Sequence, residues 1–285
     1  MIFDILLDSV LDCARLVPFL FVTYLVMEYL EHKTGEHTTK LIRKAGKLGP
    51  VWGGILGVVP QCGFSAAASS LYAGRLITVG TLLAIYLSTS DEMLPILLSE
   101  QVDPQLILKI LGIKVALAVV TGLCIDQVLL RIFRRPAEEI DIHSICEHEH
   151  CRCGEKSILR SALNHTVHIV LYIFLISIVL NLAIEAIGRE NLSGLILNVP
   201  VAGQMLAALV GMIPNCAASV IITQLYVEGI LNGGAMMAGL LANAGVGVLI
   251  LFRMHRNVKK NLQIVGMLYG AGVIWGLLIQ MSGIL

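Results

Sequence analysis

"GVVPQCGFS" (Gly57–Ser65) and "GMIPNCAAS" (Gly211–Ser219) are two copies of one pattern, Gly-x-x-Pro-(Gln/Asn)-Cys-x-x-Ser, placed 154 residues apart. Each copy lies within a long apolar stretch. Proline lacks an amide hydrogen and clashes with the preceding turn, so a helix that enters the pattern stops at Pro60 or Pro214. An amide, a thiol and a hydroxyl then follow. We therefore expect each copy to be a polar break between two apolar helices.

The composition of the chain is that of a membrane protein. The 285 residues are 56% hydrophobic and 14% charged, whereas a soluble domain carries about 25% charged residues. A formal net charge of zero gives no indication of a nucleic-acid partner. Runs of roughly 20 apolar residues suit the ~30 Å hydrocarbon core of a bilayer. We therefore predict an all-α polytopic membrane protein in a lipid bilayer, built on the runs Leu16–Leu30, Leu76–Leu87, Leu106–Leu130, Val167–Ile187, Ala235–Phe252 and Leu262–Met281.

The 154-residue offset extends beyond the motif and divides the chain into two halves. It aligns Leu71-Tyr72 with Leu225-Tyr226, and the glycine pairs Gly80 with Gly234, Gly112 with Gly266 and Gly122 with Gly276. We predict a first transmembrane repeat over 1–130, a polar linker over 131–157 and a second repeat over 158–285. Internal duplication of this kind is common in secondary transporters. Closely spaced glycines such as Gly53/Gly57, Gly266/Gly270 and Gly272/Gly276 favour close helix packing.

The distribution of Lys and Arg decides how the halves are oriented. If each motif segment crosses the membrane once, the two sides carry 7 and 10 basic residues, which is no asymmetry. If each segment enters and returns on the same side, the count becomes 16 against 1. This predicts two inverted repeats, each with a midplane helical hairpin broken at Pro-(Gln/Asn)-Cys, and about ten helical segments. It also predicts a cytoplasmic linker and both termini outside, in a multi-pass membrane protein.

The candidate substrate site consists of the two motif tips and a polar interruption that follows each tip. Thiolates favour soft metals and metalloids, and carboxylates can hold a cation or a proton. The positive end of each returning half-helix instead suits an anion or a polar neutral ligand. Both ligand classes therefore stay open for the candidate residues Gln61, Cys62, Ser65, Thr89, Asp91, Glu92, Asn215, Cys216, Ser219 and Asn243.

Ionisable residues within the apolar runs are candidates for coupling or for charge compensation. Lys109 and Lys114 are candidate counter-ions for Asp91-Glu92. Asp12 either serves in coupling or pairs with Arg15 one turn away. His165 and His168 could relay protons, and a purely structural role is equally compatible with their positions. The coupling or counter-ion candidates are thus Asp12, Lys114, His165 and His168.

The linker contains "HSICEHEHCRC" (His143–Cys153), which concentrates three His and three Cys in eleven residues. These side chains suit Zn²⁺, Cu⁺ or trivalent arsenic. Because their spacing is tighter than that of a structural zinc finger, we expect a flexible capture site; a chance cluster in a solvated loop is the alternative. No other cofactor is expected. The candidate metal ligands are His143, Cys146, His148, His150, Cys151 and Cys153.

The duplicated Pro-(Gln/Asn)-Cys-x-x-Ser tips, "STSDEMLP" (Ser88–Pro95) and the His/Cys-rich linker resemble the ten-helix heavy-metal exporters. That family is related to the arsenic efflux permeases of bacteria and archaea. The resemblance implies export of a metal or metalloid across a prokaryotic inner membrane. It also implies a site that contains Gln61, Cys62, Asn215, Cys216 and the pair Asp91-Glu92. The second half has no acid at the positions equivalent to Asp91 and Glu92, so the site should be asymmetric.

We therefore predict a secondary transporter, not an enzyme, that exports a soft metal or metalloid by means of protons or the membrane potential. No Gly-x-x-x-x-Gly-Lys-Ser/Thr motif is present to bind ATP. The first alternative is a permease for a small anion, either a sulfur oxyanion or a carboxylate. Two further alternatives are an intramembrane thiol redox enzyme and a metal-sensing membrane protein. The sequence leaves a homo-oligomer open.

Overall fold

The computed structural model describes residues 48–58, 62–90, 93–133, 166–175 and 201–285, together with single positions within 10–25 and 159–179. Every regular element in these residues is a helix. The first half contains α3 (Gly49–Leu56), α4 (Cys62–Ala73), α5 (Val79–Ser88), α6 (Met93–Ser99) and α7 (Pro104–Phe133). The second half contains α11 (Ala202–Gly211), α12 (Cys216–Val227), α13 (Gly233–Ala242), α14 (Gly247–Met254) and α15 (Val258–Ser282).

The helix starts repeat along the chain as the motif does. From α4 to α7, each helix begins 154 residues before its counterpart among α12 to α15, while α3 and α11 begin 153 residues apart. The capping residues repeat as well. The hydroxyl of Thr78 accepts a hydrogen bond from the Thr81 amide at 3.1 Å, and the Asn232 side chain accepts one from the Ala235 amide at 2.8 Å. Each cap satisfies an amide at the start of α5 or α13 that has no partner within its helix.

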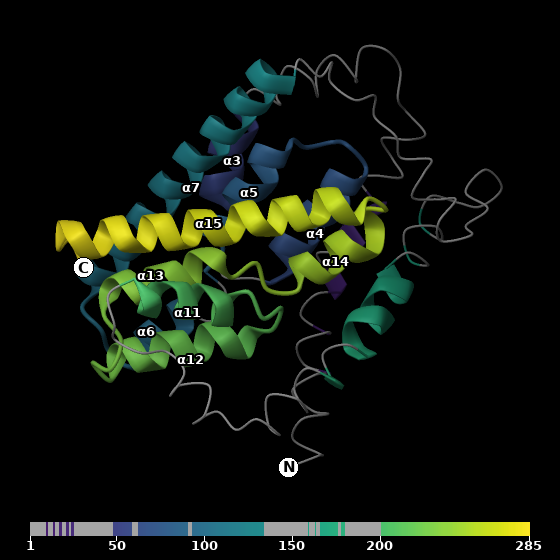
Figure 1. Ribbon diagram of the computed structural model, residues 1–285. Coiled ribbons are helices and arrows are strands. Elements are labelled where there is room, and N and C mark those ends of the chain that lie inside the picture. Colours follow the sequence, from purple (N-terminus) through teal and green to yellow (C-terminus); the bar gives the residue numbers. More distant parts are fainter. Residues whose placement is uncertain are drawn as a thin grey trace.

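Among the residues that the structure describes, four apolar segments are long enough to cross a membrane, and they differ in burial. Val79–Ser99 and Gly233–Met254 each contain a break and are 75% and 83% buried. Pro104–Val128 and Val258–Ser282 are continuous helices that are only 28% buried. Figure 1 shows α15 lying across α13 and α5. The protein is therefore a multi-pass membrane protein. Its broken helices lie in the interior of the helix bundle, and its unbroken helices lie at the surface of the bundle.

Equivalent glycines bring the inner and outer helices together. A Cβ on Gly122 of α7 would lie 2.5 Å from the carbonyl oxygen of Gly80 on α5. A Cβ on Gly276 of α15 would lie 2.6 Å from the carbonyl oxygen of Gly234 on α13. The helix backbones are in contact at both places, as small residues permit. Gly266, on the other hand, has no described atom within 4 Å of such a Cβ, so it does not serve packing within this part of the chain.

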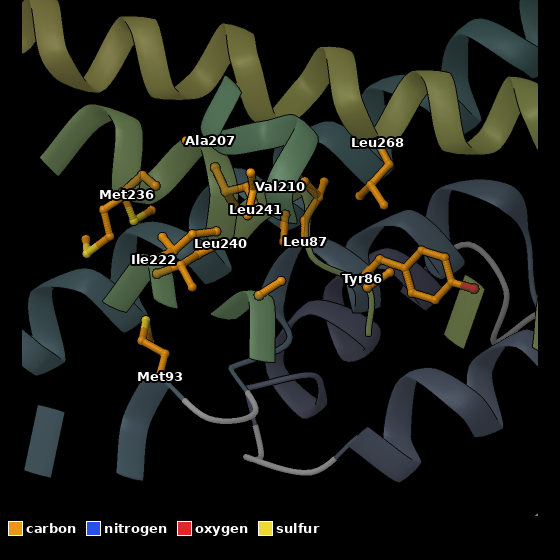
Figure 2. Packing of buried hydrophobic residues seen from close by; sticks show 14 of the residues in the cluster. Tyr86, Leu87, Met93, Ala207, Val210, Ile222, Met236, Leu240, Leu241 and Leu268 are labelled. Atoms are coloured by element: carbon orange, nitrogen blue, oxygen red, sulfur yellow. The ribbon is translucent and has the colours of Figure 1, made fainter. Parts of the chain in front are cut away.

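The two halves exchange one short helix each. Helix α14 of the second half packs on α4 of the first, and α6 of the first half packs on α12 of the second. Buried side chains from both halves form one apolar cluster, in which Leu87 of α5 lies with Leu241 of α13 and Val210 of α11 (Figure 2). This exchange places the motif helix of each half beside the break of the other half.

Candidate functional site

The second copy of the motif is a break between α11, which ends at Gly211, and α12, which begins at Cys216. The amide of Asn215 donates to the carbonyl of Ile213 at 2.7 Å, which turns the backbone sharply. The Asn215 side chain then accepts from the Ala217 amide at 3.3 Å and caps α12. Asn215 therefore has a structural role as a helix cap, in addition to any contact with substrate.

The thiol and hydroxyl of this copy lie in the first turn of α12. Cys216 is the first residue of α12 and is half-buried. Ser219 is buried, and its hydroxyl donates to the Cys216 carbonyl at 2.8 Å. The Cys216 sulfur therefore stands beside the N-terminal end of a helix, where the dipole favours negative charge. A half-buried sulfur at this position is a candidate ligand for a soft metal.

In the first copy of the motif, the structure describes Gly57, Val58 and the residues from the start of α4 at Cys62, and of Cys62 only the backbone is described. Gln61 lies outside the described residues. Ser65 is fully buried one turn into α4. A Cβ on Gly247, the first residue of α14, would lie 2.9 Å from both the Cβ and the carbonyl oxygen of Ser65. The motif helix of the first half thus contacts the end of the break in the second half.

Ser69 and Tyr86 hold this contact in place, although sequence reasoning did not select them. The Ser69 hydroxyl lies 2.6 Å from the Tyr86 hydroxyl and donates to the Gly247 carbonyl, also at 2.6 Å. Both side chains are buried, and Figure 2 shows the Tyr86 ring among the buried residues. The available signal was the spacing of Ser65 and Ser69, one turn apart in an otherwise small and apolar helix.

One residue of each polar interruption, Thr89 and Asn243, lies in the interior of the described bundle. Thr89 caps the end of α5 and is 4% exposed, and its amide and hydroxyl both donate to the Ile85 carbonyl, at 3.0 and 2.7 Å. Asn243 caps the end of α13 and is 6% exposed. Its side-chain oxygen accepts from the Gly245 amide at 2.9 Å. Gly245 has φ 52°, a left-handed conformation that favours glycine. Asp91 and Glu92 lie outside the described residues.

Lys114 connects the two interruptions. It projects from α7, is completely buried, and its ammonium donates hydrogen bonds to the carbonyl of Thr89 and, at 3.4 Å, to the carbonyl of Leu240. These acceptors belong to the ends of α5 and α13. The sequence identified the lysine as a candidate. It could not identify the lysine's partner in the other half, because that partner is a backbone carbonyl, which any residue has.

The remaining candidates lie elsewhere or outside the described residues. His168 is exposed on the helix Thr166–Leu175. Asp12, His165 and the linker ligands His143 to Cys153 are not among the residues described. Within the part of the chain that is described, no three His, Cys, Asp or Glu side chains are grouped as a metal site. The linker site and the coupling roles therefore stay predictions.

Comparison with known proteins assigns the chain to a family. No curated protein and no solved structure gave a match. One family model, described as "Putative, 10TM heavy-metal exporter", matches residues 1–190 of the 285. The match includes the first motif copy, the interruption after it and the His/Cys-rich linker. It agrees with the apolar helices of membrane-spanning length in the structure. The chain belongs to this family of heavy-metal exporters.

Proposed function

We propose that the protein is a secondary transporter that exports a soft metal or metalloid, an arsenic species or a divalent heavy metal, across a prokaryotic inner membrane. The observation that carries the proposal is the burial of two helix breaks, at Thr89 and Asn243, in the centre of the bundle. Within a membrane, non-helical backbone is tolerated only inside protein or along a water-filled cavity. Broken helices hold the substrate in many transporters, and the family supplies the class of substrate.

The substrate binds between the two motif tips and the two breaks. Cys62 and Cys216 provide sulfur, which soft metals prefer, and Asp91-Glu92 provide the charge that couples export to its driving force. The half-buried thiol of Cys216 at the start of α12 supports this assignment. The other polar candidates, Gln61, Ser65, Thr89, Asn215, Ser219 and Asn243, provide hydrogen bonds.

The halves act as inverted repeats that move against each other, each with a hairpin that reaches the midplane. The constant offset of the helix starts and the reciprocal packing of α14 on α4 and α6 on α12 support this arrangement. A twofold relation makes such packing reciprocal, because each half then presents the same surface to the other. The asymmetry of 16 basic residues against 1 supports the inverted orientation.

Protons or the membrane potential drive export, and the protein is not an enzyme. Asp12, His165 and His168 are the coupling candidates, and Lys114 is a counter-ion for Asp91-Glu92. The linker, 131–157, forms a cytoplasmic capture site that passes the metal to the membrane site. Deletion of 141–155 distinguishes this role from that of a sensor. An exporter should keep reduced transport after the deletion, whereas a sensor should lose its function entirely.

The test is transport into inverted membrane vesicles with a panel of arsenite, methylarsenite, Zn²⁺, Mn²⁺, Cu⁺ and thiosulfate. Wild-type protein should accumulate one metal or metalloid. In the double variant Cys62→Ser/Cys216→Ser, that accumulation should fall by more than about tenfold. Even residues that only orient a metal ligand change metal affinity by about 10- to 100-fold when they are replaced.

The matched control is Cys124→Ser, which removes an exposed cysteine of α7 away from the site and should leave transport unchanged. Accumulation of thiosulfate that persists in the double variant would contradict the proposal. It would instead assign the protein to the anion permeases, with helix N-termini as the binding groups.

A further inference from the structure

Lys114 places a positive charge where no water reaches it. The side chain is 0% exposed and lies near the middle of the membrane segment Pro104–Val128. An ammonium in an apolar interior destabilises the fold unless nearby groups compensate for the lost hydration. The position therefore requires a surrounding that stabilises a cation.

The described acceptors of Lys114 contribute to that surrounding through helix ends. Thr89 is the C-terminal cap of α5, and Leu240 lies in the last turn of α13. The last four carbonyls of a helix lack partners within the helix, and its C-terminal end carries roughly half a negative charge. Two negative helix ends, one from each half of the chain, thus converge on one ammonium.

We propose that this convergence is a binding site for a monovalent cation, and that Lys114 is its permanent occupant. Ends of broken helices coordinate small inorganic cations in transporters built this way. Here the ammonium of Lys114 takes that place, so the protein needs no bound Na⁺ or K⁺ to hold the ends of α5 and α13 together. The equivalent position in the second half is Leu268, which is buried and apolar, so at this pair of positions the cation comes from the first half.

The test removes the occupant and offers a replacement from solution. The part of the side chain that Lys114→Ala removes has the shape and charge of n-propylammonium. Its loss leaves the carbonyls of Thr89 and Leu240 facing an empty space. Thermal unfolding of the purified full chain in detergent is followed at constant ionic strength in choline, Na⁺, K⁺ and n-propylammonium chlorides. The unfolding temperature of the wild type should not depend on the cation. That of Lys114→Ala should be lower in choline and should rise saturably, by about 3–5 °C at ten times the apparent Kd, with n-propylammonium or one small inorganic cation.

Three controls separate charge from volume and from general salt effects. Propan-1-ol has nearly the shape of n-propylammonium without its charge and should not stabilise Lys114→Ala. Lys114→Met fills the space with a neutral side chain and should stay destabilised in every salt. Lys109→Ala is the matched control, because Lys109 lies on the same helix and also donates to a backbone carbonyl, that of Ile284 at 2.6 Å, but is exposed. It should not respond to the cation.

A Lys114→Met protein as stable as the wild type, or a Lys114→Ala protein that no cation stabilises beyond propan-1-ol, would overturn the proposal. If Lys114→Ala cannot be purified in choline, its recovery becomes the measurement. Recovery restored by n-propylammonium supports the cation site, and recovery restored by neither compound refutes it. Because the readout is stability, the result is independent of whether the protein exports a metal.

Discussion

At the scale of single residues, one methyl group tests how closely the inner and outer helices pack. A Cβ on Gly276 would lie 2.5 Å from the Cβ of Ala238 and 2.6 Å from the carbonyl oxygen of Gly234. We expect Gly276→Ala to lower the free energy of unfolding by about 1–3 kcal/mol, as overpacking does. Thermal unfolding in detergent measures the change.

The matched control for this substitution lies on the same helix. A Cβ on Gly270 would meet no described atom within 4 Å, and alanine favours a helix over glycine by about 1 kcal/mol. Gly270→Ala should therefore leave stability unchanged or raise it slightly. If Gly276→Ala and Gly270→Ala destabilise the protein equally, then close packing of α13 on α15 is not the reason why position 276 requires glycine.

The sequence predicted single residues well where the side chain itself carries the signal. Proline after an apolar helix predicted the break before Cys216, and polar residues in apolar runs predicted the buried positions of Thr89 and Asn243. Lys114 was recognised as a charge in need of compensation. Its partners could not be predicted, since every residue has a carbonyl and only the fold decides which one faces the lysine.

At the scale of helices, the equivalent starts of α5 and α13 are attached to their outer helices in different ways. Asp126 of α7 accepts from the Gly80 amide at 2.8 Å and from the Thr78 hydroxyl at 2.7 Å. Its counterpart on α15, Gln280, has a buried side-chain oxygen without a described partner. One half therefore gains a polar attachment where the other buries an unsatisfied acceptor.

Matched substitutions at these two positions should have opposite effects. Asp126→Leu removes two hydrogen bonds to a carboxylate and should cost about 1–3 kcal/mol of stability. Gln280→Leu removes an unsatisfied buried oxygen and should be neutral or stabilising. Thermal unfolding of both variants, measured side by side, checks this. A greater loss from Gln280→Leu than from Asp126→Leu would contradict it.

Helix positions were predictable because the duplication repeats their local signals. Thr78 and Asn232 cap equivalent helices, and Cys62 and Cys216 begin equivalent ones. The tie between Ser69 and Tyr86 was not predictable in this way. The second half has Leu240 where the first has Tyr86, so a comparison of the halves gave no reason to select the pair.

At the scale of the whole molecule, the basic residues predict the topology in the membrane. With 16 Lys and Arg on one side and 1 on the other, both termini should lie outside the cytoplasm. Alkaline phosphatase fused after Leu285 should therefore be active, and green fluorescent protein fused there should be dark. The same reporters inserted in the linker, 131–157, should give the reverse pattern. A fluorescent C-terminal fusion would contradict the inverted arrangement.

The way in which the halves interlock could not be predicted from the repeat. A 154-residue offset says which positions are equivalent, but it does not say whether a helix packs within its own half or on the other. The packing of α14 on α4 and of α6 on α12 is a property of the assembled surfaces. The close approach of Ser65 in α4 to the backbone of Gly247 in α14 is one contact of this kind.

This exchange of helices also has a consequence for the order of events during biosynthesis. When α12 leaves the ribosome, its partner α6 has already been made, but α4 must wait for α14, roughly 170 residues later in the chain. At 5–20 residues per second that delay is on the order of 10–30 s. During that time Ser65 and Ser69 are not covered by α14. We therefore expect the newly inserted first half to be most susceptible to quality-control proteases before α14 has been made.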